Sequence, residues 1–479
     1  MRVYSKGTVI LLALLLAGGG AMWYLRASYR QGILQRTVLN QIVGQVTQNP
    51  LERDTVSLLL GFDRPRTYLI LFLNNTEIRP GGGFIGAYAV VTLDKGIPHI
   101  RKLEGTEIID GAASPEALPA PPAPLSNYLK VERWYFRDSN WSPDFARSSA
   151  YALELYRKQH GFAADQIDGV IGFTPTVIEK ILKLMGPVSV AGQTFASNTI
   201  TERLEYEVEY GYAQRGITFD DRKKFLADLG GVILQQLKST VWRQWGDYFA
   251  LATALFKEKQ LLLYAVDPSV QQILTARGWT GEMKPSVGDY LLWVDANLGA
   301  LKTDAAIKRS LTYQLTPTSS GFIAQARMVF KHQGHFDWRT SRYRDYVRVY
   351  VPKDSTFLTV KGSMKIDKSR EPGMVNEGVE EGRRWFGTFI SIEPGKSAEL
   401  VFEYFVDPAV VTAIRAGSYH LLVQKQIGSL ATPLTLGLKF DTKVVAAAPG
   451  EASERHGDGR YDLQTDLRED RQFSVTLQK

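Results

Sequence analysis

The most constraining feature of the sequence is a change in its pattern of apolar residues near Ala305. Before that point, short apolar runs such as Tyr68 to Leu73 alternate with helical patterns, and glycine or proline separates them. After it, nearly every segment up to Val445 is rich in strand-forming residues or alternates apolar with polar residues. Alternating strands and helices are typical of a sheet covered by helices, whereas successive short strands are typical of a sandwich. We therefore predict an α+β chain, with an α/β domain over residues 62–304 and a C-terminal β-sandwich over residues 305–445.

The N-terminus contains an uncharged apolar run from Gly7 to Leu25. At ~1.5 Å per residue, a helix of this length matches the ~30 Å hydrocarbon core of a membrane. We predict that residues 1–28 are a transmembrane signal anchor. The protein would then be a single-pass protein of the plasma membrane with its body outside the cytoplasm. Small residues between Ala17 and Ala21 leave open a cleaved signal peptide, which would also export the body.

Two further segments flank the predicted domains. Residues 29–61 carry apolar residues at helical spacing, which predicts a helical stalk after the anchor. Residues 446–479 begin rich in alanine and glycine and continue charged, with few apolar residues. We predict a mobile tail there, in which residues 472–477 could add one strand.

The composition excludes several kinds of chemistry. The chain of 479 residues has no Cys, so it can hold no disulfide, zinc–thiolate site, iron–sulfur cluster or cysteine nucleophile. It also lacks the HExxH, P-loop and GxSxG signatures of zinc proteases, nucleotide-binding enzymes and α/β-hydrolases. The net charge of +7 is dispersed along the chain, which together with the export signal argues against a nucleic-acid partner.

The loop after the first apolar strand, residues 74–83, combines asparagines, a Glu-x-Arg pair and three consecutive glycines. Ligands of open α/β sheets bind beyond the carboxyl ends of the strands, where this loop begins. Glycine N–H groups can approach an anion closely, Arg79 can bind phosphate through two hydrogen bonds, and Glu77 could hold a metal ion or accept a proton. The candidate residues of this loop are Asn74, Asn75, Glu77, Arg79, Gly81 and Gly82. The alternative is an ordinary turn in which Glu77 pairs with Arg79.

Three further polar segments lie next to predicted strand or helix ends. Two of them precede predicted helices, whose N–H groups and positive dipole ends favour anions. The third follows an apolar strand and could close the same site. The candidate residues from these segments are Asp138, Asn140, Arg222, Asn297 and Lys302. Helix caps and ordinary loops are the alternative explanation for each segment.

Several strings resemble an uncharacterised bacterial family known only as a domain of unknown function. They include NNTEIRPGGGFIGAYAVVTLDKG, DSNWSPDFARSSAYALELY and VDANLGALKTDAAIKRSLTY. The resemblance extends over about residues 60–440, and members of that family typically carry one N-terminal membrane segment. It implies a fold and a topology and supplies no chemistry.

A second resemblance concerns mechanism. The block IDGVIGFTPTVIEKILKLMGPVSV, with Arg222 downstream, is similar to part of the LytR-CpsA-Psr family. Those membrane-anchored bacterial enzymes transfer glycopolymers from polyprenyl-diphosphate carriers to cell-wall acceptors, using an α/β domain that receives the lipid tail. By this resemblance, Arg79 and Arg222 bind the diphosphate, and Glu77 with Asp138 are the acidic groups near Mg²⁺. Residues 305–445 have no counterpart in that family.

Two functions remain open. The first is a cell-envelope phosphotransferase that acts on a polyprenyl-diphosphate-linked glycan, in which Arg79, Arg222, Glu77 and Asp138 are catalytic and meet at the end of an apolar tunnel. Its substrate-binding residues would be Asn74, Asn75, Gly81, Gly82, Asn140, Asn297 and Lys302. The second is a non-catalytic envelope module that binds a polysaccharide or a protein through the sandwich. The membrane and a cell-wall polymer are the expected partners.

Overall fold

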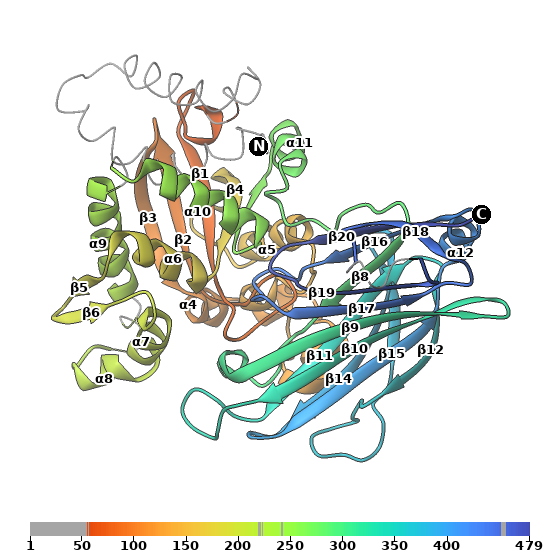
Figure 1. Ribbon diagram of the computed structural model, residues 1–479. Coiled ribbons are helices and arrows are strands. Elements are labelled where there is room, and N and C mark those ends of the chain that lie inside the picture. Colours follow the sequence, from red (N-terminus) through yellow and green to blue (C-terminus); the bar gives the residue numbers. More distant parts are fainter. Residues whose placement is uncertain (1–54, 56, 219–221, 223, 241–242, 452–456) are drawn as a thin grey trace.

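The computed structural model describes residues 55, 57–218, 222, 224–240, 243–451 and 457–479 (Figure 1). The predicted transmembrane segment and most of the predicted stalk lie outside these residues. Within the described ranges, no helix combines the length and the apolar character needed to cross a membrane.

A mixed five-stranded sheet forms the centre of the first domain, in the order β3-β2-β1-β4-β7. Its strands are β1 (Arg66–Asn74), β2 (Phe84–Asp94), β3 (Ile97–Gly105), β4 (Ile167–Phe173) and β7 (Leu261–Ala265). β1 and β4 run parallel, and the other neighbouring pairs are antiparallel. β1 lies in the middle with apolar side chains on both faces, as its unbroken apolar run predicts.

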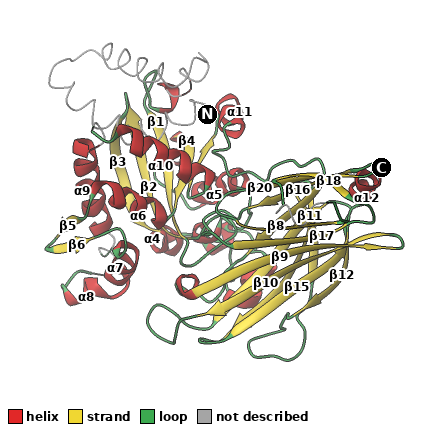
Figure 2. Ribbon diagram, in the orientation of Figure 1, coloured by secondary structure: helices red, strands yellow, loops and turns green. Residues whose placement is uncertain are grey.

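Helices cover both faces of this sheet (Figures 1 and 2). Apolar residues of α6, α9 and α10 share one core with one face of the sheet, and α5 packs on the other face. The helices of this domain are α4 (Thr106–Ala112), α5 (Phe145–Lys158), α6 (Pro175–Met185), α7 (Ile200–Tyr206), α8 (Tyr212–Gln214), α9 (Lys224–Thr240), α10 (Trp245–Lys257) and α11 (Pro268–Ala276). A small hairpin of β5 (Val188–Val190) and β6 (Gln193–Phe195) follows α6. The α/β domain is therefore a sheet between two helical layers.

Two sheets form the second domain and share one apolar core. The six-stranded sheet contains, in spatial order, β12 (Thr356–Lys361), β15 (Ser397–Phe405), β10 (Gly321–His332), β9 (Ile307–Thr318), β17 (Pro433–Lys439) and β19 (Arg460–Asp466). The seven-stranded sheet contains β13 (Asn376–Glu380), β14 (Arg383–Ile392), β11 (Tyr343–Pro352), β8 (Asp289–Val294), β16 (Ser418–Gln424), β20 (Arg471–Leu477) and β18 (Val444–Ala448). Helix α12 (Pro408–Arg415) connects β15 to β16. Alternating residues of both sheets fill the space between them, as in a sandwich.

Short 3-10 and π-helical turns complete the described secondary structure. They are η1 (Pro115–Ala117), η2 (Leu125–Leu129), η3 (Phe136–Asp138), η4 (Ala164–Gln166), η5 (Glu207–Gly211) and η6 (Thr303–Ala306). η3 and η5 matter most for function, because residues next to or within them reach the candidate site.

Two predictions about the second domain need correction. β8 was assigned by sequence to the α/β domain, but it pairs with β11 and β16, so the sandwich starts before residue 305. A continuous apolar strand is buried on both faces wherever it lies, so its composition does not say which sheet it joins. The predicted mobile tail over residues 446–479 instead contains most of β18 together with β19 and β20. Backbone pairing holds these strands despite their polar composition: β19 pairs with β17, β20 pairs with β16, and β18 pairs with β20. The single strand predicted over residues 472–477 is confirmed as β20.

The loop between β16 and β17 joins the two domains. Ile427, which is 1% exposed, belongs to the core beneath the first sheet. Gly428 N donates to the Lys259 carbonyl at 3.0 Å, and its carbonyl accepts a hydrogen bond from Asn75 Nδ2 at 2.9 Å. Gly428 has φ +72°, and a Cβ atom there would lie 2.0 Å from the Gly82 carbonyl oxygen. The junction therefore needs glycine both for its left-handed backbone and for its close approach.

Substituting Gly428 by alanine tests this junction. We expect Gly428→Ala to lower the free energy of unfolding by at least ~2 kcal/mol more than Gly395→Ala. Gly395 has nearly the same φ, +73°, but no atom lies within 4 Å of its added Cβ, so it reports the backbone cost alone, about 1 kcal/mol. Urea unfolding of both variants measures the difference. Equal losses of stability would show that the close approach between the domains contributes nothing.

Candidate functional site

The loop that follows β1 is buried between the two domains. The side chains of Arg79 and Glu77 are 3% and 5% exposed, and Arg79 Nη2 donates to Glu77 Oε1 at 2.9 Å. Arg79 Nη1 donates to the Asn297 carbonyl, and its Nε lies 3.8 Å from Asp138 Oδ1. Burial raises the pKa of Glu77, although Arg79 and Lys302 act to lower it. The alternative prediction, a turn in which Glu77 pairs with Arg79, is confirmed.

The Arg79 guanidinium contacts both carboxylates to which the sequence analysis assigns Mg²⁺. Glu77 and Asp138 therefore already have a cation between them, and their arrangement does not fit a metal site. In the part of the chain that the structure describes, no three His, Asp or Glu residues are placed to hold a metal ion together. Mg²⁺ stays a prediction, and no step below passes through a metal.

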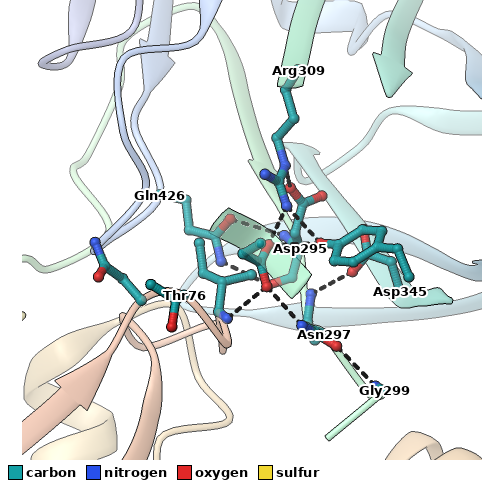
Figure 3. A network of polar contacts seen from close by, with 12 residues as sticks. Thr76, Asp295, Asn297, Gly299, Arg309, Asp345 and Gln426 are labelled. Atoms are coloured by element: carbon teal, nitrogen blue, oxygen red, sulfur yellow. Dashed lines mark hydrogen bonds and ion pairs between the residues drawn. The ribbon is translucent and has the colours of Figure 1, made fainter. Parts of the chain in front are cut away.

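A network of polar contacts continues from this loop into the sandwich (Figure 3). Arg309 Nε lies 2.6 Å from Asp295 Oδ2, and Arg309 Nη2 donates to Asp304 Oδ1. Asp304 Oδ2 accepts a hydrogen bond from Ile78 N at 2.9 Å, which ties the loop to this network. Burial raises the pKa of Asp345 well above its ordinary value, and Asp295 raises it further. Burial and the neighbouring Asp295 carboxylate thus both favour the protonated form of the Asp345 side chain.

Most residues that the sequence analysis assigned to substrate bond to the protein itself. Asn140 Nδ2 donates to the Gly83 carbonyl at 2.7 Å, and Gly81 N donates to the Asn140 carbonyl at 2.9 Å. Asn297 Nδ2 donates to Asp304 Oδ2 at 2.8 Å. Asn75 and Gly82 contact the inserted β16–β17 loop. These residues hold the junction together.

A cavity of about 580 Å³ lies between the first sheet and α9. It runs along β1 from Tyr68 to Asn74, a length of about 20 Å at ~3.3 Å per residue. Apolar residues of four elements line it: Ile70 and Phe72 of β1, Ala89 and Val91 of β2, Val177 and Ile181 of α6, and Leu226, Gly230 and Leu234 of α9. Ile100 of β3 also lines it and is 49% exposed, so the cavity reaches the surface beside this edge strand.

Small residues keep the cavity open. A Cβ atom added at Gly230 would meet no atom within 4 Å, although Gly230 faces the sheet from the middle of α9. Ile70 and Phe72 stand at the centre of the sheet and are nevertheless only half-buried. Protein interiors normally leave few voids larger than a water molecule, and ligand sites typically measure ~300–1,000 Å³. The cavity therefore has the size and the apolar walls of a ligand site.

Charged side chains gather at the end of the cavity where β1 ends. Three of the described residues that line this end are cations, and each lies beside a carboxylate. Arg222 Nη2 lies 2.7 Å from Glu107 Oε1, and Lys302 Nζ lies 3.0 Å from Glu209 Oε1. Arg137 Nε lies 3.6 Å from Asp138 Oδ2.

Lys302 keeps its charge at this end. Burial lowers the pKa of Lys302, but Glu77 and Glu209 raise it above its ordinary value overall. Of the predicted site residues, Asn74, Arg222 and Lys302 line the cavity.

The buried Arg79 cluster lies directly behind this charged end. The Arg79 guanidinium carbon is 5.4 Å from the centre of the Phe84 ring, and Phe84 lines the cavity. Arg137 connects the charged end to the buried Arg79 cluster, because Arg137 lines the cavity and its Nε lies 3.6 Å from Asp138 Oδ2. The prediction that Glu77, Arg79, Asp138 and Arg222 converge on one cleft is confirmed only in part: the first three lie together, and only Arg222 lines the cavity. Arg137 is not among the residues predicted from the sequence, where its sole signal is its place beside Asp138.

Comparisons with known proteins support the predicted resemblance to an uncharacterised family. Residues 63–208 match the family described as Protein of unknown function (DUF4012). No curated protein matches the chain.

Solved structures give weak similarities. A protein of Legionella pneumophila described as nutrient binding is 8% identical, with a TM-score of 0.23 over 40% of this chain and 72% of its own. Leukotriene A4 hydrolase of Saccharomyces cerevisiae is 8% identical, with a TM-score of 0.22 over 36% of this chain and 29% of its own. An M1 zinc metallopeptidase of Deinococcus radiodurans is 11% identical, with a TM-score of 0.18 over 40% of this chain and 43% of its own. The chain thus spans less than half the length of either enzyme, and these scores are too low to support an argument. The resemblance to LytR-CpsA-Psr proteins is not shown by these comparisons.

Removing the buried guanidinium should destabilise the protein strongly. We expect Arg79→Ala to lower the free energy of unfolding by ~3–5 kcal/mol, because Glu77 and the Asn297 carbonyl would lose their partner in a buried site. Arg327→Ala is the matched control, since Arg327 forms an ion pair with Glu399 in which both side chains are more than 40% exposed. Its cost should be ~0–1 kcal/mol. Thermal or urea unfolding measures the loss of stability in each variant. Similar losses in Arg79→Ala and Arg327→Ala would contradict the structural role of Arg79.

Asp110 of α4, behind the charged end, should make stability depend on pH. Burial raises its pKa to about 7, and Asp138 raises it while Arg137 lowers it. The unfolded value is ~3.9, so folding takes up a proton and stability should fall as pH rises from about 4 to about 7. Asp110→Asn keeps an oxygen acceptor for Phe136 N, which donates to Asp110 Oδ1 at 3.0 Å, and should remove part of this fall.

Unfolding at pH 5 and pH 7.5 measures the effect, which is at most ~3 kcal/mol over this interval, because only about two units of the shift lie between pH 5 and the native pKa of about 7. The control is Asp165→Asn, because the Asp165 side chain is 97% exposed and should leave the pH dependence unchanged. An unchanged pH dependence in Asp110→Asn would contradict the raised pKa.

Proposed function

We propose that the protein is a membrane-anchored envelope protein that binds a long-chain lipid in the cavity beneath α9. The phosphorylated head of the lipid would lie at Arg137, Arg222 and Lys302. The observation that carries this proposal is an apolar cavity whose charged groups are gathered at one end. Such a cavity matches the two parts of an amphiphile.

The apolar part of the cavity favours an aliphatic chain. Burial of apolar surface contributes ~25 cal/mol per Å², so a chain lying along β1 gains from both the sheet and α9. The lining side chains Ile70 and Phe72 would lose their remaining contact with water at the same time. An elongated cavity of about 20 Å suits a linear chain better than a compact ligand.

The charged end favours a phosphate. Arg222 is 8% exposed, and a guanidinium in such a site can form two short hydrogen bonds to one phosphate. Its present partner, Glu107, is 27% exposed, so its carboxylate can turn to solvent when a phosphate replaces it. Lys302 adds a second cation that stays protonated.

The expected ligand is a polyprenyl diphosphate that carries a glycan. This expectation combines the cavity with the uncharged N-terminal run, which would place the body at the outer surface of a membrane. Transfer of the glycan to a cell-wall polymer stays a prediction, because Glu77, Arg79 and Asp138 are not among the residues that line the cavity. A protein that binds the lipid without transferring the glycan fits the same cavity.

Filling the cavity from α9 tests the proposal. Gly230→Trp places an indole in the cavity without a backbone clash, since nothing lies within 4 Å of the added Cβ. Gly231→Trp is the matched control: it makes the same change one residue further on, where Gly231 is exposed and equally free of contacts. We expect Gly230→Trp to weaken binding of radiolabelled polyprenyl diphosphate to the full-length protein in nanodiscs at least tenfold. Gly231→Trp should bind like the unmodified protein.

The head group is tested separately. Arg222→Gln should weaken binding of polyprenyl diphosphate and leave binding of the uncharged polyprenol unchanged, because only the phosphate contacts the guanidinium. If Gly230→Trp and Gly231→Trp bind the diphosphate equally well, the cavity is not the lipid site. If Arg222→Gln weakens both lipids equally, the assigned position of the head is wrong.

A further inference from the structure

Three aromatic side chains, Tyr206, Tyr210 and Trp338, form a patch beside the charged end of the cavity. The exposed Phe336 lies two residues before Trp338 in the chain. Tyr206 ends α7 and Tyr210 lies in η5, while Phe336 and Trp338 belong to the loop between β10 and β11. The rings of Tyr206 and Tyr210 lie 5.5 and 5.6 Å from that of Trp338, and 6.1 Å from each other. Tyr210 is 46% exposed and Phe336 is 63% exposed. The aromatic patch thus reaches solvent and is built from both domains.

The aromatic patch is continuous with the cavity. Glu205 lines the cavity and accepts a hydrogen bond at 2.7 Å from Nε of Arg339, the residue after Trp338. Glu209, the residue before Tyr210, also lines the cavity and pairs with Lys302. A ligand whose head lies at Lys302 would therefore extend from the cavity directly onto these rings.

The winding of the helix supports this arrangement. Residues 207–211 form a π-helical turn between α7 and α8. Such turns are rare and occur frequently at functional sites. Here the turn places Val208 and Glu209 on the cavity, while Tyr210 stacks on Tyr206 within the patch. One short segment therefore contributes to both surfaces.

The chemistry of the aromatic patch suits a saccharide. Aromatic faces pack against the C–H faces of pyranose rings, and carboxylates accept hydrogen bonds from sugar hydroxyls. Glu202 and Glu209 supply such carboxylates at 65% and 43% exposure. A protein partner generally needs ~800 Å² on each side, which is more than three partly exposed side chains provide.

We infer that the aromatic patch binds the pyranose residues joined to the head of the lipid in the cavity. This inference rests on the proposed lipid-binding function and names the part of the ligand that lies outside the cavity. The aromatic rings stack on the sugars, and the neighbouring carboxylates and Arg339 contact their hydroxyl groups.

Two lipid probes test the inference on the full-length protein in nanodiscs: polyprenyl diphosphate, and the same lipid carrying an N-acetylglucosamine disaccharide. We expect the unmodified protein to bind the sugar-bearing lipid about tenfold more tightly, which corresponds to ~1.4 kcal/mol. Tyr210→Ala and Trp338→Ala should each reduce this gain and leave the affinity for the bare lipid unchanged. Tyr210→Phe, which keeps the ring, should retain the gain.

Phe405→Ala is the matched control, because Phe405 is an exposed aromatic residue of β15 outside the patch, at 38% exposure. It should change neither affinity. Equal affinity of the unmodified protein for the two lipids would overturn the inference and leave lipid binding intact. Equal losses for both lipids in Tyr210→Ala would overturn it as well, since the ring would then support the cavity. Failure of the unmodified protein to bind the bare lipid would instead contradict the proposed function, and with it the inference.

Discussion

A buried guanidinium at the domain junction sets the geometry of the candidate site. Arg79 has almost no access to water, so its charge must be met by the protein, and Glu77 together with the Asn297 carbonyl meets it. A buried charge without a partner costs several kcal/mol, so the loop cannot leave this position easily. The loop runs from Asn74 to Phe84, and both residues line the cavity. The shape of the charged end therefore depends on the second domain, although most of the cavity walls come from the first.

The first domain keeps a cavity where a bulkier set of residues would give a solid core. Glycine within a helix costs roughly 0.5–1 kcal/mol relative to alanine, and Gly230 bears that cost in the middle of α9. Apolar side chains such as Phe72 remain half-buried when they could be covered completely. Both features lower stability and both are explained by a bound aliphatic chain, which would cover the exposed apolar surface. The same reasoning explains why, among the described lining residues, the cations with carboxylate partners gather at the end where a lipid head would lie.

Much of the fold follows from the sequence, because the elements are long and their patterns are clear. The unbroken apolar run predicts β1 at the centre of its sheet, and the strand-forming segments after residue 305 predict the sandwich. β8 was placed in the wrong sheet, because a strand buried on both faces carries the same composition in either domain. The strand predicted over residues 472–477 is confirmed as β20. The composition does not predict β18 and β19, because they are held by pairing of backbone groups, which composition does not record.

The candidate site was less predictable. The resemblance to a lipid-linked enzyme family singled out Arg222, which lines the cavity, and the pattern of the loop left open the pairing of Glu77 with Arg79. The cavity itself gave no signal, because Ile70 and Phe72 have the composition of ordinary core residues. Only the position of α9 relative to the sheet distinguishes a lined cavity from a filled core, and that position is a tertiary property.

The central claim is that the cavity beneath α9 holds a lipid chain with its phosphate at the charged end. The most direct measurement is a crystal structure of the full-length protein with polyprenyl diphosphate. The account expects continuous density along β1 from Tyr68 to Asn74, with phosphate oxygens ~2.7–2.9 Å from nitrogen atoms of Arg222 and Lys302. Lipid density on another surface, with the cavity free of the chain, would contradict it.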